Sequence, residues 1–352
     1  MTPGLDCLIL PALRKDQDKQ IRPRYLDISL ADAVRLRAAT IHSAFAAFDP
    51  DVLIVDKLPR GAAQELDPTL EYLKRRGRTR CVLGLRDVLD EPGAVQCDWS
   101  AAGDAEAIRD YYDDIWVYGD PNIYDAAREY QFPADIAAKV TYTGYLDQRP
   151  RLKFADVGSD PLPGLELPPG RLALCLVGGG QDGEALAEAF VRAELPAGFN
   201  GVLITGPFMP AEAQERLRVF AEGKPRLRVL DFLPEPAVLV SRADRVVAMG
   251  GYNTVCEVLS FEKQALIVPR VRPRSEQWIR AQRLRTLGLI DVIHPDSLSA
   301  TAISAWLAGA DCKPPRAREL MDFEGLTRLP VLLEEVLARP RQTSIKQVKE
   351  SV

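Results

Sequence analysis

A glycine-rich segment in the second half of the chain has the composition of a phosphate-binding turn. Residues 177–183 read Val-Gly-Gly-Gly-Gln-Asp-Gly, directly after an apolar run and before a helical pattern. Glycines at such a turn let backbone N–H groups approach a phosphate closely, and the N-terminus of the following helix adds partial positive charge. The segment therefore predicts a diphosphate site, with a glycine turn that holds no ligand as the competing interpretation.

The glycines of this segment also match a dinucleotide-binding fingerprint, at Gly178, Gly180 and Gly183. That fingerprint requires an acidic residue at the end of the following strand, where it binds the adenosine ribose. Here the following strand is expected to end at residues 204–207, Ile-Thr-Gly-Pro, which include no carboxylate. The sequence therefore disfavours a nicotinamide or flavin enzyme and retains diphosphate binding.

A second strand-to-helix turn carries the sequence Met-Gly-Gly-Tyr-Asn-Thr-Val-Cys-Glu at residues 249–257. Thr254 and Glu257 have the spacing of a capping box, which by itself would explain both side chains. Alternatively, Gly250 and Gly251 make room for a phosphate or a sugar, and Glu257 accepts hydrogen bonds from ribose hydroxyls. Spacing alone favours the cap, whereas two glycine-rich turns in one domain favour a nucleotide.

A third segment, residues 269–277, reads Pro-Arg-Val-Arg-Pro-Arg-Ser-Glu-Gln. Arginines between a strand end and a helix suit a diphosphate, because a guanidinium can bind it with two parallel hydrogen bonds. Gln277 could bind sugar hydroxyls, since an amide both donates and accepts hydrogen bonds. The alternative is that Glu276 and Gln277 are ordinary helix-start residues.

The elements that would position these segments alternate along the whole chain, which is typical of parallel α/β sheets. Expected helices include Leu30–Phe48, Leu66–Arg76 and Ala211–Ala221. Expected strands are Cys7–Leu10, Val52–Val55, Cys81–Leu85, Ile115–Tyr118 and Val140–Tyr142, then Leu172–Val177, Val202–Thr205, Leu227–Leu230, Arg245–Met249 and Ala265–Val268. We therefore expect two doubly wound, Rossmann-like domains facing a cleft, with ligands at the carboxyl ends of the strands.

Composition narrows the class of protein further. The chain has 352 residues and a formal net charge of −5, so its overall charge gives no electrostatic attraction to nucleic acid. Its six cysteines form no CxxC pair, which predicts neither a zinc site nor a redox motif, and favours a reduced, cytoplasmic protein. No run approaches the ~20 apolar residues of a membrane-spanning helix, so any membrane contact would be peripheral.

The run MGGYNTVCEVLSF, followed by ALIVPRVRPRSEQWIRAQRL, resembles the C-terminal domain of glycosyltransferase family 28. This family includes the peptidoglycan enzyme that adds N-acetylglucosamine to a lipid-linked precursor. The resemblance extends over about Arg171 to Leu307, and more loosely over LIVDKLP and LGLRDVLDEP in the first half. It implies the GT-B architecture, with residues 1–150 as acceptor domain, 151–170 as linker, 171–312 as nucleotide-sugar domain, and 313–352 as C-terminal helix and tail.

The resemblance also implies roles for individual residues in binding a nucleotide-sugar. The glycine turns are the expected diphosphate and sugar contacts, Glu257 the ribose ligand, Arg270 a phosphate ligand and Gln277 the sugar ligand. The whole expected set is Gly178, Gly179, Gly180, Phe232, Leu233, Gly250, Gly251, Asn253, Thr254, Glu257, Arg270 and Gln277. Phe232 and Leu233 would read the base edge through their backbone. The family usually has Asn where this chain has Arg280, which leaves the identity of the donor sugar open.

The implied activity is a metal-independent transfer of a hexose from a nucleotide-diphospho-sugar, with uridine the expected base. Helix N-termini and arginines would neutralise the leaving diphosphate, and no cofactor is expected. The acceptor is unidentified, with a lipid-linked molecule and a small metabolite both open. Two rivals are a sugar-nucleotide 2-epimerase of the same fold, and a catalytically incomplete partner of a split glycosyltransferase.

The first residues and the catalytic base depart from the family pattern. Cys7–Leu10 resembles a later strand of the family, so the opening strand, turn and helix are expected to be absent. His42 and His294 are more simply packing or surface residues than bases. The strand-end aspartates Asp56, Asp87 and Asp120 would face the cleft, although aspartate is common in turns and caps. We therefore assign no catalytic base.

Overall fold

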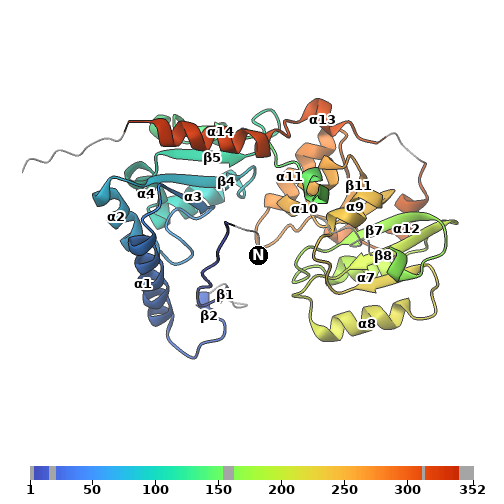
Figure 1. Cartoon of the computed structure of the whole chain (residues 1–352). Helices are drawn as coiled ribbons and strands as arrows, with labels where there is room; N and C mark the ends of the chain where they lie inside the picture. Colours follow the sequence, from blue (N-terminus) through green and yellow to red (C-terminus); the bar gives the residue numbers. More distant parts are fainter. Residues whose placement is uncertain (1–3, 16–20, 154–161, 311–313, 341–352) are drawn as a thin grey trace, which may run out of the picture.

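The computed structural model describes residues 4–15, 21–153, 162–310 and 314–340. Within them, two separate parallel sheets, each flanked by helices, lie side by side (Figure 1). This is the mixed α/β architecture that the alternating pattern predicts. The exact domain boundaries stay a prediction.

The sheet of the C-terminal half has six parallel strands in the order β12-β11-β10-β7-β8-β9. Most of their residues are buried, because helices cover both faces of the sheet. The strands are β7 (Arg171–Leu176), β8 (Phe199–Ile204), β9 (Leu227–Leu230), β10 (Arg245–Ala248), β11 (Gln264–Ile267) and β12 (Asp291–Val292). Strand order reverses between β7 and β10, and such a switch point is where doubly wound sheets bind ligands.

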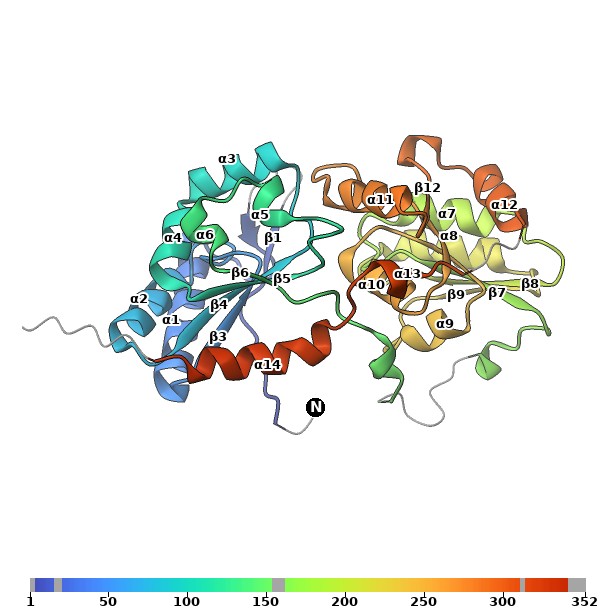
Figure 2. The ribbon, with the colours of Figure 1, turned by 90° about the horizontal axis from the view of Figure 1, so that it is seen from above.

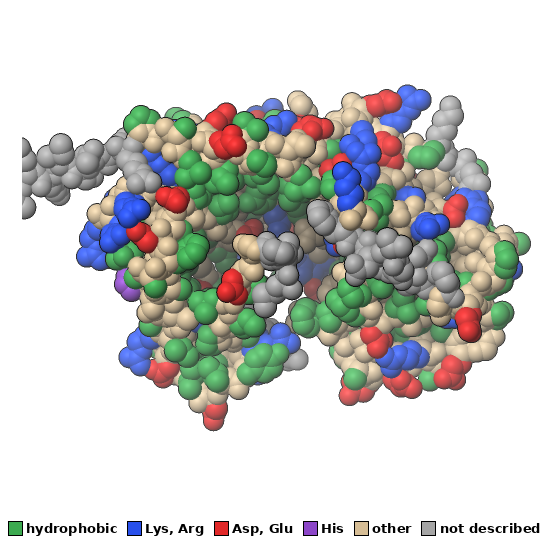
Figure 3. Space-filling view, in the orientation of Figure 1, with side chains coloured by type: hydrophobic (Ala, Val, Ile, Leu, Met, Phe, Trp, Pro, Cys, Tyr) green, Lys and Arg blue, Asp and Glu red, His purple; other side chains and the backbone are tan. Residues whose placement is uncertain are grey.

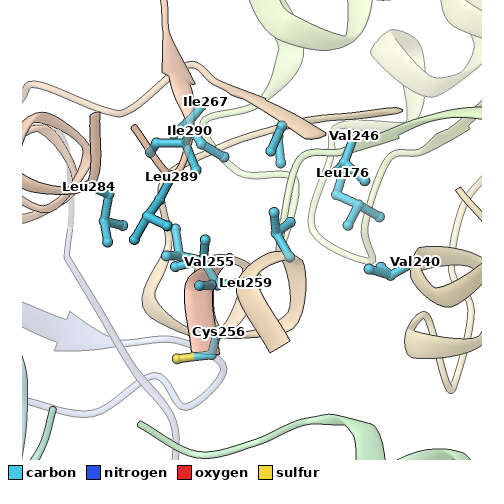
Figure 4. Packing of buried hydrophobic residues seen from close by; sticks show 14 of the residues in the cluster. Leu176, Val240, Val246, Val255, Cys256, Leu259, Ile267, Leu284, Leu289 and Ile290 are labelled. Carbon is cyan, nitrogen blue, oxygen red and sulfur yellow. The ribbon is translucent and has the colours of Figure 1, made fainter. Parts of the chain in front are cut away.

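Two groups of helices cover the faces of this sheet. Its helices are α7 (Glu184–Arg192), α8 (Ala211–Ala221), α9 (Ala237–Arg242), α10 (Tyr252–Ser260), α11 (Glu276–Thr286), α12 (Ala300–Ala308) and α13 (Ala317–Leu320), with the 3₁₀ turns η2 (Pro163–Leu165) and η3 (Pro295–Ser297). On one face, Val240, Val255 and Leu284 from α9, α10 and α11 belong to one hydrophobic cluster with the strand residues Leu176 and Val246 (Figure 4). The other face is covered by α7, α8 and α12.

The N-terminal half is built on four parallel strands in the order β3-β4-β5-β6. These are β3 (Val52–Asp56), β4 (Arg80–Arg86), β5 (Asp114–Tyr118) and β6 (Val140–Tyr142). The accompanying helices are α1 (Leu30–Phe48), α2 (Asp67–Arg76), α3 (Pro92–Ala102), α4 (Asp104–Tyr111), α5 (Ala126–Glu129) and α6 (Ala134–Ala137), and the 3₁₀ turn η1 (Arg149–Lys153) follows the sheet. Helices α3 to α6 are additions to the sequence-based expectation.

The last helix, α14 (Gly325–Ala338), returns from the C-terminal half to the N-terminal sheet (Figure 2). Its Leu332 and Val336 are buried against Val82 of β4 and Trp116 of β5. Hydrophobic side chains gather beneath α14 on the face shown in Figure 3. The chain thus crosses between the halves twice, so that the N-terminal half is built from two separate segments of the chain and the C-terminal half from one.

The expected strand Cys7–Leu10 is wrong. Residues 5–12 form no regular structure, and the side chain of Ile9 is 90% exposed. The first strands are instead β1 (Leu13–Lys15) and β2 (Ile21–Pro23), which form a small antiparallel hairpin outside both sheets. An apolar run becomes a strand only where a neighbouring strand accepts its hydrogen bonds, and among the described residues nothing pairs with 7–10.

The basic run at the end of α2 is held by local ion pairs. Arg76 and Arg78 both contact Asp49, and Arg80 contacts Asp113. Among the described residues, no helix has the length and apolarity to cross a membrane.

A buried ion pair joins the two halves. Asp87, just after β4, is 1% exposed, and Arg280 of α11 is 2% exposed. Arg280 donates from Nη2 to Asp87 Oδ1 at 2.6 Å and from Nε to Oδ2 at 2.9 Å, and its Nη1 donates to the Gly250 carbonyl at 3.1 Å. Tyr145 Oη also donates to Asp87 Oδ2, at 3.1 Å. Both charges are therefore paired and hydrogen-bonded, which a buried pair requires.

The same N-terminal loop makes a second contact with the C-terminal half. Asp90 Oδ1 accepts from the backbone N–H of Ser275 at 2.7 Å, and its Oδ2 accepts from Arg274 at 3.2 Å. Arg274 also donates to Asp98 of α3 at 3.0 Å. Loop 87–90 thus holds both the start and the middle of α11.

We predict that Arg280→Met destabilises the protein by about 3–5 kcal/mol, because it leaves the Asp87 carboxylate buried without a counter-ion. The double variant Asp87→Leu/Arg280→Met should recover most of that loss, since an apolar pair of similar volume can replace a buried ion pair. Urea unfolding of the full chain measures both.

The matched control is Arg283→Met, which removes an exposed pair with Glu129 that also joins the halves. We expect it to cost at most about 1 kcal/mol. Equal losses for Arg280→Met and Arg283→Met would contradict the structural role given to the buried pair.

Candidate functional site

The first glycine turn connects β7 to α7 at the switch point of the C-terminal sheet. Gly178 and Gly180 have φ values of 63° and 90°, which side chains rarely adopt. A Cβ at Gly180 would lie 2.2 Å from the Thr205 carbonyl oxygen, so only glycine fits. Gly178 and Gly179 are exposed, and α7 begins after Gly183 without a capping side chain. The first N–H groups of α7 therefore have no side-chain cap among the described residues, and such helix starts can bind anions.

The second glycine turn follows β10, the strand that pairs with β7. Gly251 is the N-cap of α10, which also begins without a capping side chain. The capping-box interpretation is therefore wrong: α10 already starts at Tyr252, so Thr254 lies inside the first turn. The two glycine turns that the sequence predicts separately are thus carried by adjacent parallel strands at the same edge of the sheet.

Glu257 contacts an arginine that the sequence analysis did not single out. Arg151 of η1 donates to Glu257 Oε1 at 2.6 Å and forms a 2.9 Å ion pair with Glu235. Glu257 is 6% exposed, and burial raises the pKa of its carboxyl while the Arg151 guanidinium opposes that rise. The turn η1 thereby supplies the counter-charge of the expected ribose ligand. Only its Arg-Pro-Arg composition at 149–151 signals this in the sequence.

Arg270 and Gln277 meet at the start of α11. The side-chain Oε1 of Gln277 accepts from the backbone N–H of Arg270 at 3.0 Å, and Gln277 is buried. The guanidinium of Arg270 contacts Asp182 of the first glycine turn at 3.0 Å and Glu276 at 2.5 Å. Arg270 therefore lies beside the first glycine turn, as a phosphate ligand would, although two carboxylates hold it in this structure.

The remaining expected residues differ in accessibility. Phe232, after β9, is 60% exposed, whereas Leu233 packs partly against the core. Asn253 is exposed and Thr254 is partly buried, both in the first turn of α10. A flat exposed ring near a strand end is suited to stacking on a base. The roles of these residues stay predictions.

The candidate bases are placed as follows. Asp87 is fully committed to Arg280 and Tyr145, and Asp120 is buried, accepting from the backbone N–H groups of Asn122 and Asp322. Asp56 is the exposed member of the three. Among the described residues, no three His, Cys, Asp or Glu side chains are grouped to hold a metal ion.

Both histidines make structural contacts. His42 of α1 packs edge-on against Tyr72, with ring centroids 4.9 Å apart. His294 Nδ1 accepts from the backbone N–H of Asp296 and so caps η3, and its ring contacts Trp278. The interpretation of both as packing or surface residues therefore agrees with their positions.

Comparison with known sequences finds a similarity in the C-terminal half. Residues 173–322 match the glycosyltransferase family 28 C-terminal domain. A protein of Methanosarcina acetivorans, described as an uncharacterized glycosyltransferase, is 30% identical over 140 residues, which are 39% of this chain. The matched segment spans 33% of that relative's length.

Comparison with solved structures covers both halves. MurG of Acinetobacter baumannii is similar with a TM-score of 0.55 and 16% identity, over 92% of this chain and 82% of that one. The UDP-GlcNAc 2-epimerase of Neisseria meningitidis, bound to UDP-GlcNAc, gives 0.57 and 11% identity, over 89% and 82%. At such identities the likeness concerns the fold. The chain thus has the fold of the GT-B glycosyltransferases, and its C-terminal domain is similar to that of glycosyltransferase family 28.

Proposed function

We propose that this protein is a glycosyltransferase that takes a hexose from a nucleotide-diphospho-sugar, with UDP as the expected nucleotide, and passes it to an unidentified acceptor. The observation that carries the proposal is the meeting of two uncapped, glycine-led helix starts, α7 and α10, at the switch point of one parallel sheet. Two such N-termini beside each other favour a ligand with two phosphates.

The donor would lie across the ends of β7 and β10. Its diphosphate is placed at Gly178–Gly180 and the start of α7, with Arg270 alongside. Its ribose hydroxyls would donate to the Glu257 carboxylate, for which Arg151 is the counter-ion. The sugar would reach toward Gln277, and the base toward Phe232 and Leu233.

Transfer then requires an acceptor oxygen to attack the anomeric carbon as the bond from that carbon to the diphosphate breaks. The electron pair of this bond remains on the diphosphate oxygen, and the acceptor proton passes to a base that we leave unassigned. Helix dipoles and Arg270 would stabilise the charge that develops on the leaving group, which is the role of a divalent cation in other enzymes. We therefore propose a metal-independent reaction.

A sugar-nucleotide 2-epimerase is the second candidate, because a structural neighbour carries that description with UDP-GlcNAc bound. The two reactions differ in their products. An epimerase converts the nucleotide-sugar with no acceptor present and keeps the nucleotide attached, whereas a glycosyltransferase releases a nucleoside diphosphate. Because an epimer has the same mass as its substrate, NMR of nucleotide-sugars incubated with the full chain detects epimerisation, and release of a nucleoside diphosphate in the presence of candidate acceptors detects transfer.

We predict that saturating UDP raises the melting temperature of the full chain. A ligand that binds only the folded state at a hundred times its Kd adds about 2.7 kcal/mol of stability. Differential scanning fluorimetry across nucleoside mono- and diphosphates measures the shift. If no diphosphate at millimolar concentration moves the transition, the proposed donor site is wrong.

We predict that Glu257→Gln weakens UDP binding and leaves the melting temperature nearly unchanged. Hydrogen bonds to a charged group contribute about 1.5–3 kcal/mol, roughly a tenfold or larger loss of affinity, whereas Gln can still accept from Arg151. Isothermal titration of both proteins measures the difference.

Glu235→Gln is the matched control for this experiment. Glu235 shares the Arg151 guanidinium with Glu257 but is not among the expected ribose ligands. We expect its UDP affinity to equal that of the unmodified chain. Equal losses in both variants would indicate that the Arg151 ion pairs, and not a ribose contact, determine binding.

A further inference from the structure

A turn at the carboxyl end of the N-terminal sheet holds Lys57 in an unusual backbone conformation. Lys57 follows β3 with a φ of 69°, a region that non-glycine residues seldom adopt. Its N–H donates to the Gly84 carbonyl at 2.7 Å, and the N–H of Leu58 donates back to the Asp56 carbonyl at 2.8 Å. Tyr112 Oη donates to the carbonyl of Pro59 in the same turn. Such strain persists where the surroundings impose it, and it is concentrated at functional sites.

The Lys57 ammonium is half-buried among other cations. No hydrogen bond or ion pair of its side chain is found within the described residues. Burial lowers the pKa of Lys57, the positive charges of Arg274 and Arg86 lower it further, and the carboxylates of Glu276 and Asp56 act in the opposite direction. An ammonium in such a place is destabilised unless an anion joins it.

Arg86 and Arg274 approach the same place from the two halves. Arg86 ends β4, the neighbour of β3, and its closest carboxylate, Asp56, is 3.8 Å away and largely exposed. The Arg86 guanidinium also lies 5.9 Å from the centre of the Tyr252 ring at the start of α10. Arg274 comes from the C-terminal half and is held by Asp90 and Asp98. Three cations thus gather where the carboxyl ends of the N-terminal strands face the C-terminal half.

We propose that Lys57 and Arg86, with Arg274 opposite them, form a second anion site that binds a phosphoryl group of the acceptor. The inference rests on the proposed function for the existence of an acceptor. Lysine binds phosphate as a point charge, and arginine adds hydrogen bonds of fixed direction. A phosphoryl group placed there would offset the repulsion among the three cations.

The donor diphosphate is assigned to a different set of residues. The glycine turn and Arg270 belong to the C-terminal sheet, whereas Lys57 and Arg86 end adjacent strands of the N-terminal sheet. Arg270 is engaged by Asp182 and Glu276, and Lys57 has no described carboxylate partner. Two anions can therefore bind at once, one in each half.

The test is titration of inorganic pyrophosphate into the full chain, with and without saturating UDP. We expect pyrophosphate to bind in both conditions, and Lys57→Met and Arg86→Met each to weaken it at least tenfold while UDP affinity is unchanged. Lys74→Met, which removes an exposed lysine of α2, is the matched control and should leave pyrophosphate binding intact. Melting temperatures of all variants report on folding.

The outcomes separate this inference from the donor site. Lys57-dependent pyrophosphate binding without any UDP binding would support the second site and overturn the donor proposal. Complete displacement of pyrophosphate by UDP, or equal affinity in Lys57→Met, would overturn the second site. Vesicles of phosphatidylcholine with and without phosphatidic acid identify the source. Lys57-dependent binding to the acidic vesicles assigns the site to a lipid phosphate. Pyrophosphate binding without vesicle binding assigns it to a soluble acceptor. Both results support the site.

Discussion

The buried pair between Asp87 and Arg280 is the interaction on which the placement of the two halves depends. Moving two charges out of water is costly, and the cost is offset only because every oxygen of Asp87 and most of the guanidinium are hydrogen-bonded. The pair joins the residue after β4 in the N-terminal half to α11 in the C-terminal half. It therefore fixes which strand ends face each other, and it withdraws Asp87 from any role as a base.

Around this fixed point, the two halves present different chemistry to the space between them. The C-terminal half offers backbone N–H groups at two uncapped helix starts, together with the carboxylate of Glu257. The N-terminal half offers side-chain cations at the ends of β3 and β4. Arg270 and Arg151 are both held by carboxylates, so that the expected donor site is already organised by internal ion pairs. A bound nucleotide would have to share or replace these contacts.

Much of the fold could be predicted from the sequence because buried parallel strands are short apolar runs. The helices Leu30–Phe48 and Ala211–Ala221 agree with the structure to the residue. Cys7–Leu10 has the same composition but forms no strand, since pairing depends on a neighbour that local sequence does not reveal. The return of α14 and the Arg151–Glu257 pair likewise join residues more than a hundred positions apart. The sequence predicts the glycine turns because their conformation is set by neighbouring residues. It does not predict the ion pairs between the halves, because their partners are far apart in the chain.

The central claim is that a nucleotide diphosphate binds where the turns after β7 and β10 meet. Hydrogen–deuterium exchange of the full chain, with and without UDP, tests this most directly, because a bound diphosphate would occupy the free N–H groups at the starts of α7 and α10. The account predicts slower exchange in residues 178–186 and 250–257, and little change in β3 and β4. Protection absent from both turns, or confined to the N-terminal sheet, would contradict it.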